Sequence, residues 1–230
     1  MSSFAQQLMI LLLNGPYWFR GIDALFGLVY IIVTLLIAAM SYKAFKVTGE
    51  KKYYYFSAAF VLMSISFLIY SLINIVLTMH LSNTLTNILT QFDYGFLLHM
   101  MFMFAALTLL LVVTLKIEQK KVIILLFTLM LLFTIFSYQY YIKFHIISFL
   151  LLFFLGHQFY TNYLEKRNFN AKLVFISFYL LACSQVFFLA MVYFNPIFYV
   201  VADILQLLGF LVLFYMFVRV LQYGREKREA

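Results

Sequence analysis

The side chain best placed for chemistry in this sequence is Asp203, which lies inside a long apolar segment. It follows Pro196 by seven residues, which is about 10 Å along a helix that starts at the proline. A charge at that depth of a membrane costs about 2.5–3.5 kcal/mol on insertion scales. Gln206 lies three residues later and shares nearly the same helical face. The pair predicts a polar cavity that binds a small ligand or a proton; a structural ion pair and a lipid-exposed interface are the alternatives.

Other polar side chains are predicted on the same side of the membrane. Asp23 and Asp93 lie near the starts of apolar segments, where a carboxylate in the first helical turn contributes ~0.3–1 kcal/mol by offsetting the helix dipole. That capping role is the alternative to ligand binding for both aspartates. Cations from the same side would pair with Asp203. The predicted ligand-binding set is therefore Asp203, Gln206, Asp93, His99, Asp23, Arg20, Lys143 and His145.

The histidines suggest a further alternative, a b-type haem electron carrier. His145 and His157 are twelve residues apart in one segment, about 18 Å along a helix, which suits two stacked haems ligated by imidazoles. His99 supplies a partner for His145 only, so at most one such site is expected. The leading prediction includes no cofactor and no metal site. The single cysteine, Cys183, excludes an intrachain disulfide and a thiolate cluster.

The composition requires lipid around most of the chain. Of 230 residues, 66% are hydrophobic and 10% are charged, more apolar surface than a soluble domain of this size can bury. One crossing takes roughly 20 apolar residues. We therefore predict an all-α integral membrane protein with seven transmembrane helices in one domain, residues 1–230. The apolar segments are Ile22–Met40, Phe56–Met79, Tyr94–Leu115, Val122–Tyr138, Phe144–Phe159, Leu173–Phe194 and Ile197–Val218.

Lysine and arginine residues orient these segments. They concentrate in alternate gaps and in the C-terminal tail, and such residues stay on the cytoplasmic side. The expected topology has the N-terminus outside and the C-terminus inside the cell membrane, with residues 1–15 as an outer interfacial segment and 224–230 as a cytoplasmic tail. The formal charge of +8 then reflects orientation and anionic lipid rather than nucleic acid. The basic inner loops are a predicted contact for a cytoplasmic protein. Tyr138, Tyr140 and Tyr141 adjoin a predicted boundary, where tyrosines place their hydroxyl groups in water.

A weak internal repeat relates the first three segments to the last three. Shifting the chain by 120 residues places Ser57 on Ser177, and shifting it by 110 places Asp93 on Asp203. The pattern predicts a 3+1+3 parallel pseudo-repeat. This topology resembles that of SWEET-type sugar transporters, which bend at prolines, and that of microbial rhodopsins. The only prolines here are Pro16 and Pro196, and the last segment has no lysine for a retinal Schiff base.

Catalysis has little support in the sequence. His-Glu-x-x-His, Gly-x-Ser-x-Gly, glycine-rich phosphate loops and Cys-x-x-Cys are all missing. We therefore expect a non-enzymatic, receptor-like or sensory membrane protein that binds a small ligand or proton in an outward-facing polar cavity. A small-solute or proton-coupled transporter is the first alternative, ahead of the haem protein.

Overall fold

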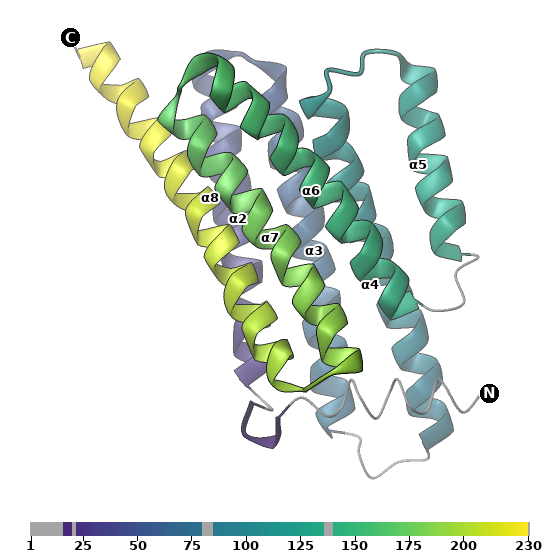
Figure 1. The fold of residues 1–230 in the computed structure, drawn as a ribbon. Coiled ribbons are helices and arrows are strands. Elements are labelled where there is room, and N and C mark those ends of the chain that lie inside the picture. Colours follow the sequence, from purple (N-terminus) through teal and green to yellow (C-terminus); the bar gives the residue numbers. More distant parts are fainter. Residues whose placement is uncertain (1–15, 20–21, 80–84, 136–139, 230) are drawn as a thin grey trace.

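A computed structural model describes residues 16–19, 22–79, 85–135 and 140–229. The predicted interfacial segment 1–15 lies outside the described residues. The described chain is helical, and Figure 1 shows its long helices side by side in one bundle. The elements are η1 (Tyr17–Phe19), α2 (Ile22–Thr48), α3 (Lys51–Met79), α4 (Leu85–Thr114), α5 (Lys120–Ile135), α6 (Tyr140–Lys166), α7 (Phe169–Tyr193) and α8 (Ile197–Glu229).

Six of these helices are long and apolar enough to cross a membrane, namely α2, α3, α4, α6, α7 and α8. Large apolar side chains such as Leu28, Leu72 and Leu150 are about half exposed on the outside of the bundle. Lipid is the solvent that accepts such a surface without penalty. The chain is therefore a multi-pass membrane protein. Helix α5 has 16 residues, which is about 24 Å and shorter than a hydrocarbon core of about 30 Å.

The bundle has two distinct ends (Figure 1). Helices α2, α4, α6 and α8 begin at the end that carries Pro196, which we call the proline end. Helices α3, α5 and α7 begin at the opposite end, which we call the basic end. Its residues include Lys43, Lys46, Lys51, Lys52, Lys116, Lys120, Lys121, Arg167 and Lys172.

The six long helices form two groups of three around a common interior. Helix α3 packs between α2 and α4, and α7 packs between α6 and α8. Contacts between α2 and α8 and between α4 and α6 close the ring, while α5 packs on the outside of α4. The serines that the predicted 3+1+3 pseudo-repeat would match make different polar contacts. Ser57 donates to Ala38 O in α2, whereas Ser177 donates to Gly209 O in α8. The repeat itself stays a prediction.

Local chemistry sets several helix ends. Gly49 ends α2 with a φ of 71°, a conformation that glycine adopts without strain, and its N–H donates to Phe45 O at 2.8 Å. Asn168 caps α7 by accepting from Asn170 N at 2.9 Å. Asn195 accepts from Ile197 N at 2.9 Å, and Pro196 has no N–H to leave unpaired at the start of α8.

Three expectations about local position need revision or extension. Asp23 lies in the first turn of α2 as predicted, but α4 begins at Leu85, which places Asp93 in the third turn and makes its predicted capping role wrong. The predicted segments Val122–Tyr138 and Phe144–Phe159 leave Lys143 in the gap between them. The structure instead places Lys143 within α6, because that helix begins at Tyr140. Residues 224–229 of the predicted tail continue α8.

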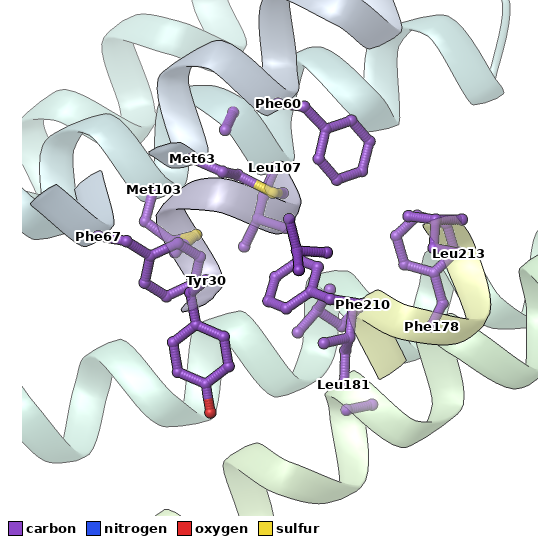
Figure 2. Packing of buried hydrophobic residues seen from close by; sticks show 14 of the residues in the cluster. Tyr30, Phe60, Met63, Phe67, Met103, Leu107, Phe178, Leu181, Phe210 and Leu213 are labelled. Atoms are coloured by element: carbon purple, nitrogen blue, oxygen red, sulfur yellow. The ribbon is translucent and has the colours of Figure 1, made fainter. Parts of the chain in front are cut away.

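Large apolar side chains fill the middle of the bundle (Figure 2). They come from both groups of helices and form one cluster with Phe210 of α8 near its centre; Figure 2 labels, among others, Phe60, Met63, Leu107, Phe178, Leu181 and Leu213. Gly209 lets α8 approach α7 closely, because a Cβ atom there would lie 2.8 Å from Leu181 Cγ and 3.2 Å from Ser177 O. Small residues commonly permit such approaches between membrane helices.

Replacing Gly209 by valine is expected to destabilise the protein by about 1–3 kcal/mol, because the added atoms overpack the contact between α7 and α8. Thermal unfolding of the purified protein in detergent measures the change. Leu208→Val is the matched control, since Leu208 is 45% exposed on the outside of the same helix. Equal unfolding midpoints for the two variants would contradict the described packing.

Candidate functional site

A cavity lies inside the half of the bundle nearer the proline end. It encloses about 70 Å³ of space that the centres of water-sized spheres can occupy, roughly five times what one water molecule needs. All six long helices contribute to its wall. Near the proline end the wall includes Asp23 of α2, Tyr141 of α6 and Tyr199 of α8. Asp23 is half-buried, while Tyr141 and Tyr199 are buried.

The floor of the cavity is apolar. It consists of the lining residues nearest the basic end on five of the helices, namely Met63, Leu107, Leu152, Leu181 and Phe210. The next residues toward the basic end are fully or almost fully buried and belong to the same hydrophobic cluster: Phe60, Leu110, Leu155, Phe178 and Leu213. Figure 2 shows part of this packing. The cavity therefore ends in the middle of the bundle.

Asp203 lies in the wall, held by a hydrogen-bonded contact between the first and last long helices. The Tyr30 hydroxyl lies 2.8 Å from Asp203 O and 3.1 Å from Asp203 Oδ1, and it donates to both. The Asp203 side chain is only 4% exposed, and its second oxygen, Oδ2, has no hydrogen-bond partner among the described residues. A buried carboxylate oxygen without a partner is costly. Asp203 therefore carries unused accepting capacity.

His99 is fixed by α3. Its Nδ1 lies 3.0 Å from the Ser66 carbonyl oxygen and 2.7 Å from Ser66 Oγ, while the Ser66 hydroxyl donates to His99 O at 2.8 Å. A carbonyl oxygen only accepts, so this geometry assigns the proton of the neutral ring to Nδ1. Each hydrogen bond that the described residues make to the ring uses Nδ1. Nε2 therefore remains as an acceptor on a side chain that lines the cavity.

His145 has the same arrangement with different partners. Its Nδ1 lies 2.7 Å from Gln185 Oε1, so the neutral ring donates there and keeps Nε2 as an acceptor. Gln185 Nε2 in turn donates to Ser184 Oγ at 3.2 Å and to Gln206 Oε1 at 3.4 Å. The His145 ring also stacks on Phe188, with 4.9 Å between ring centroids. A chain of side chains thus links α6, α7 and α8 around the cavity.

Hydroxyl groups complete the polar wall. Tyr70 and Tyr199 meet through their hydroxyl oxygens at 3.5 Å, a long contact. Tyr141 Oη and Ser148 Oγ are buried and have no partner among the described residues. Both side chains line the cavity, so the expected interfacial position of Tyr141 is wrong. A tyrosine at a helix start can face the bundle interior as readily as the membrane boundary, and sequence position alone does not separate the two.

The structure brings most of the predicted site residues to one place. Asp203, Gln206, His99, His145 and Asp23 all line the cavity, although their role in ligand binding stays a prediction. Lys143 is half-buried and is not part of the wall. Arg20 lies outside the described residues, and so does the side chain of Asp93, although its backbone belongs to α4.

Other members of the wall were missed by sequence reasoning, chiefly Tyr30, Tyr70, Ser148, Gln185 and Tyr199. Tyr30 and Gln185 did carry a signal. Each is a polar group well inside an apolar segment, where a hydroxyl or an amide usually needs a partner from another helix.

Haem does not fit this cavity. A space of about 70 Å³ holds a few water molecules, not a porphyrin, and His157 is exposed on the outside of α6. Within the described ranges there is also no group of three or more His, Cys, Asp or Glu side chains that could hold a metal ion. Comparisons with protein families, with curated proteins and with solved structures find no match for this chain. Function must therefore be argued from its own residues.

Removing the Tyr30 hydroxyl by Tyr30→Phe is expected to cost about 1–3 kcal/mol of stability, because it leaves the buried Asp203 carboxylate without its donor. Thermal unfolding in detergent measures the loss. Tyr215→Phe is the control, since Tyr215 lies on the same bundle but is 55% exposed. If both variants unfold at the wild-type temperature, Tyr30 does not stabilise Asp203.

Proposed function

We propose that this protein is a receptor-like or sensory protein of the cell membrane, which binds a small ligand or a proton in the cavity around Asp203. The observation that carries this proposal is a cavity whose wall includes buried polar atoms without hydrogen-bond partners among the described residues. Asp203 Oδ2, Tyr141 Oη and Ser148 Oγ all have unused hydrogen-bonding capacity. Convergent polar groups in a largely apolar cavity are the usual form of a small-molecule site.

The proposed topology places the proline end outside the cell and the basic end in the cytoplasm, with seven crossings. The charge distribution supports the orientation. The path of the chain supports seven crossings. Helices α4 and α6 run in the same direction and contact each other. The chain that connects them must therefore return from the basic end to the proline end (Figure 1). Helix α5 takes that route. The cavity would then face the cell exterior.

Sensing explains the geometry better than transport does. The cavity ends on a packed apolar floor in the middle of the bundle, and the six long helices are not interrupted by proline, since Pro196 lies before α8. Transporters usually bind substrate at broken helices. A ligand wedged between the two helix groups would instead change how they pack. A cytoplasmic protein at the basic end would detect that change.

A small-solute or proton-coupled transporter remains the alternative. The observation that favours it is the position of the cavity between two groups of three helices, which is where transporters with internal repeats bind their substrates.

Cysteine labelling tests the proposed cavity and its orientation. In a Cys183→Ala background, we expect Ser148→Cys to react with methyl methanethiosulfonate, because Ser148 lines the cavity. Ser177→Cys is the matched control and should stay unreactive, since Ser177 is fully buried below the floor. Mass spectrometry of the purified protein measures both.

The same background reports orientation. On intact cells, a membrane-impermeant maleimide should label Asn195→Cys and spare Lys120→Cys, because these exposed residues lie at the proline end and the basic end. An unreactive Ser148→Cys would remove the accessible cavity, and labelling of Lys120→Cys alone would reverse the orientation.

Proton flux separates the two functions. Liposomes that contain the purified protein and a pH-sensitive dye should acidify no faster than empty liposomes under a potassium-diffusion potential, because the apolar floor interrupts any polar path. Flux above this background that Asp203→Asn abolishes would establish the transporter instead.

A further inference from the structure

The wall of the cavity is selective in charge. Its ionisable residues other than tyrosine are Asp23, Asp203, His99 and His145, and no described lysine or arginine lines it. Lys143 lies near the proline end, in the first turn of α6, but it is not part of the wall, and the other described lysines and arginines lie toward the basic end. A small anion would therefore meet the Asp203 carboxylate, whereas a cation would meet an Asp203 oxygen that has no hydrogen-bond partner among the described residues.

The unused polar atoms are mostly acceptors. Asp203 Oδ2 has no hydrogen-bond partner within the described ranges, and the Nδ1 contacts of His99 and His145 leave Nε2 of each ring to accept. Tyr141 Oη and Ser148 Oγ can accept as well as donate. A ligand that satisfies this wall must bring several donors. A protonated primary amine brings three N–H donors together with one positive charge.

Aromatic rings surround these acceptors. The rings of Tyr30, Phe67 and Phe210 contact one another, with centroids 5.1 to 5.9 Å apart, beside Asp203. Phe144 contacts both histidine rings, with centroids 5.1 Å from His99 and 5.0 Å from His145. Aromatic faces attract organic ammonium groups and cover alkyl chains. A hydrated inorganic ion gains less from such a wall, and no metal-binding cluster is found among the described side chains.

We propose that the cavity binds a small primary alkylammonium ion, with its ammonium group on Asp203 and its alkyl group against the aromatic rings. This inference rests on the proposed function, because it names the ligand class of the same cavity. Tyr30 lies 3.1 Å from Oδ1, and Oδ2 has no hydrogen-bond partner among the described residues and is the oxygen left for the ligand. The cavity, in which the centres of water-sized spheres can occupy about 70 Å³, suits a small ion.

Saturation-transfer NMR on the purified protein tests the inference with ethylammonium as the probe. Three non-hydrogen atoms limit the affinity, so the expected Kd is no tighter than about 0.5 mM. Acetate and ethanol match the probe in size but lack its positive charge, and both should give no saturable signal. Potassium chloride should not compete at equal ionic strength.

Two variants locate the charge. Asp203→Asn should weaken ethylammonium binding at least tenfold, because it replaces the charged oxygen and adds a competing donor. Glu118→Gln is the control, since it removes one exposed carboxylate at the basic end and should bind like wild type. Arg20→Gln should also leave the affinity unchanged. If the wild-type protein does not bind ethylammonium but the Arg20→Gln variant does, Arg20 occupies Asp203 in the native protein. That result overturns the inference.

The remaining outcomes separate this inference from the proposed function. Binding of acetate or ethanol that equals that of ethylammonium overturns the ligand class and leaves the cavity as a binding site. No binding of any probe, with Ser148→Cys still reactive, overturns the amine and retains an accessible cavity for another ligand. No binding together with an unreactive Ser148→Cys removes both. Wild-type affinity in Asp203→Asn removes the assigned role of Asp203.

Discussion

The contact between Tyr30 and Asp203 is the interaction on which the site depends. Lipid and apolar side chains surround this part of the bundle, so a carboxylate there needs donors from the protein or from a ligand. The Tyr30 hydroxyl provides one donor and links α2 to α8 at the point where the ring of helices closes. Oδ2 has no hydrogen-bond partner in the described part of the chain. The same contact therefore stabilises the bundle and keeps one polar atom available.

The separation of charge along the bundle gives this site its character. The basic end collects lysines from three connections, while the cavity wall contains acidic and imidazole groups. The apolar cluster around Phe210 lies between the two regions. Under the proposed function, a ligand in the cavity would act on the packing of the two helix groups rather than on the basic loops directly. Any response at the basic end must travel through the positions of the helices.

Sequence reasoning located the helices well, because lipid imposes a simple rule on apolar length. Two predicted starts are those of the observed helices, Ile22 for α2 and Ile197 for α8. The predicted end at Met79 is also the observed end of α3. It was weaker where a polar residue extends a helix beyond its apolar stretch. Lys143 belongs to α6 and Asp93 to the third turn of α4, because backbone hydrogen bonding continues a helix regardless of the hydropathy of its side chains.

The site was only partly predictable for a related reason. Asp203 and Gln206 share a face by their spacing, and both line the cavity. Their partners Tyr30 and Gln185 come from other helices, and helix rotation within a bundle is set by packing rather than by composition. Tyr141 shows the limit clearly, since its sequence position suits a membrane boundary while its hydroxyl is buried and lines the cavity.

A double-mutant cycle between Tyr30 and Asp203 tests the central claim most directly. Unfolding free energies of Tyr30→Phe, Asp203→Asn and the double variant give the coupling between the two side chains. The described hydrogen bond predicts a coupling of about 0.5–3 kcal/mol, the range found for residues in one network. Additive effects, with no coupling beyond error, would show that the two side chains do not meet, and the site built on their contact would be lost.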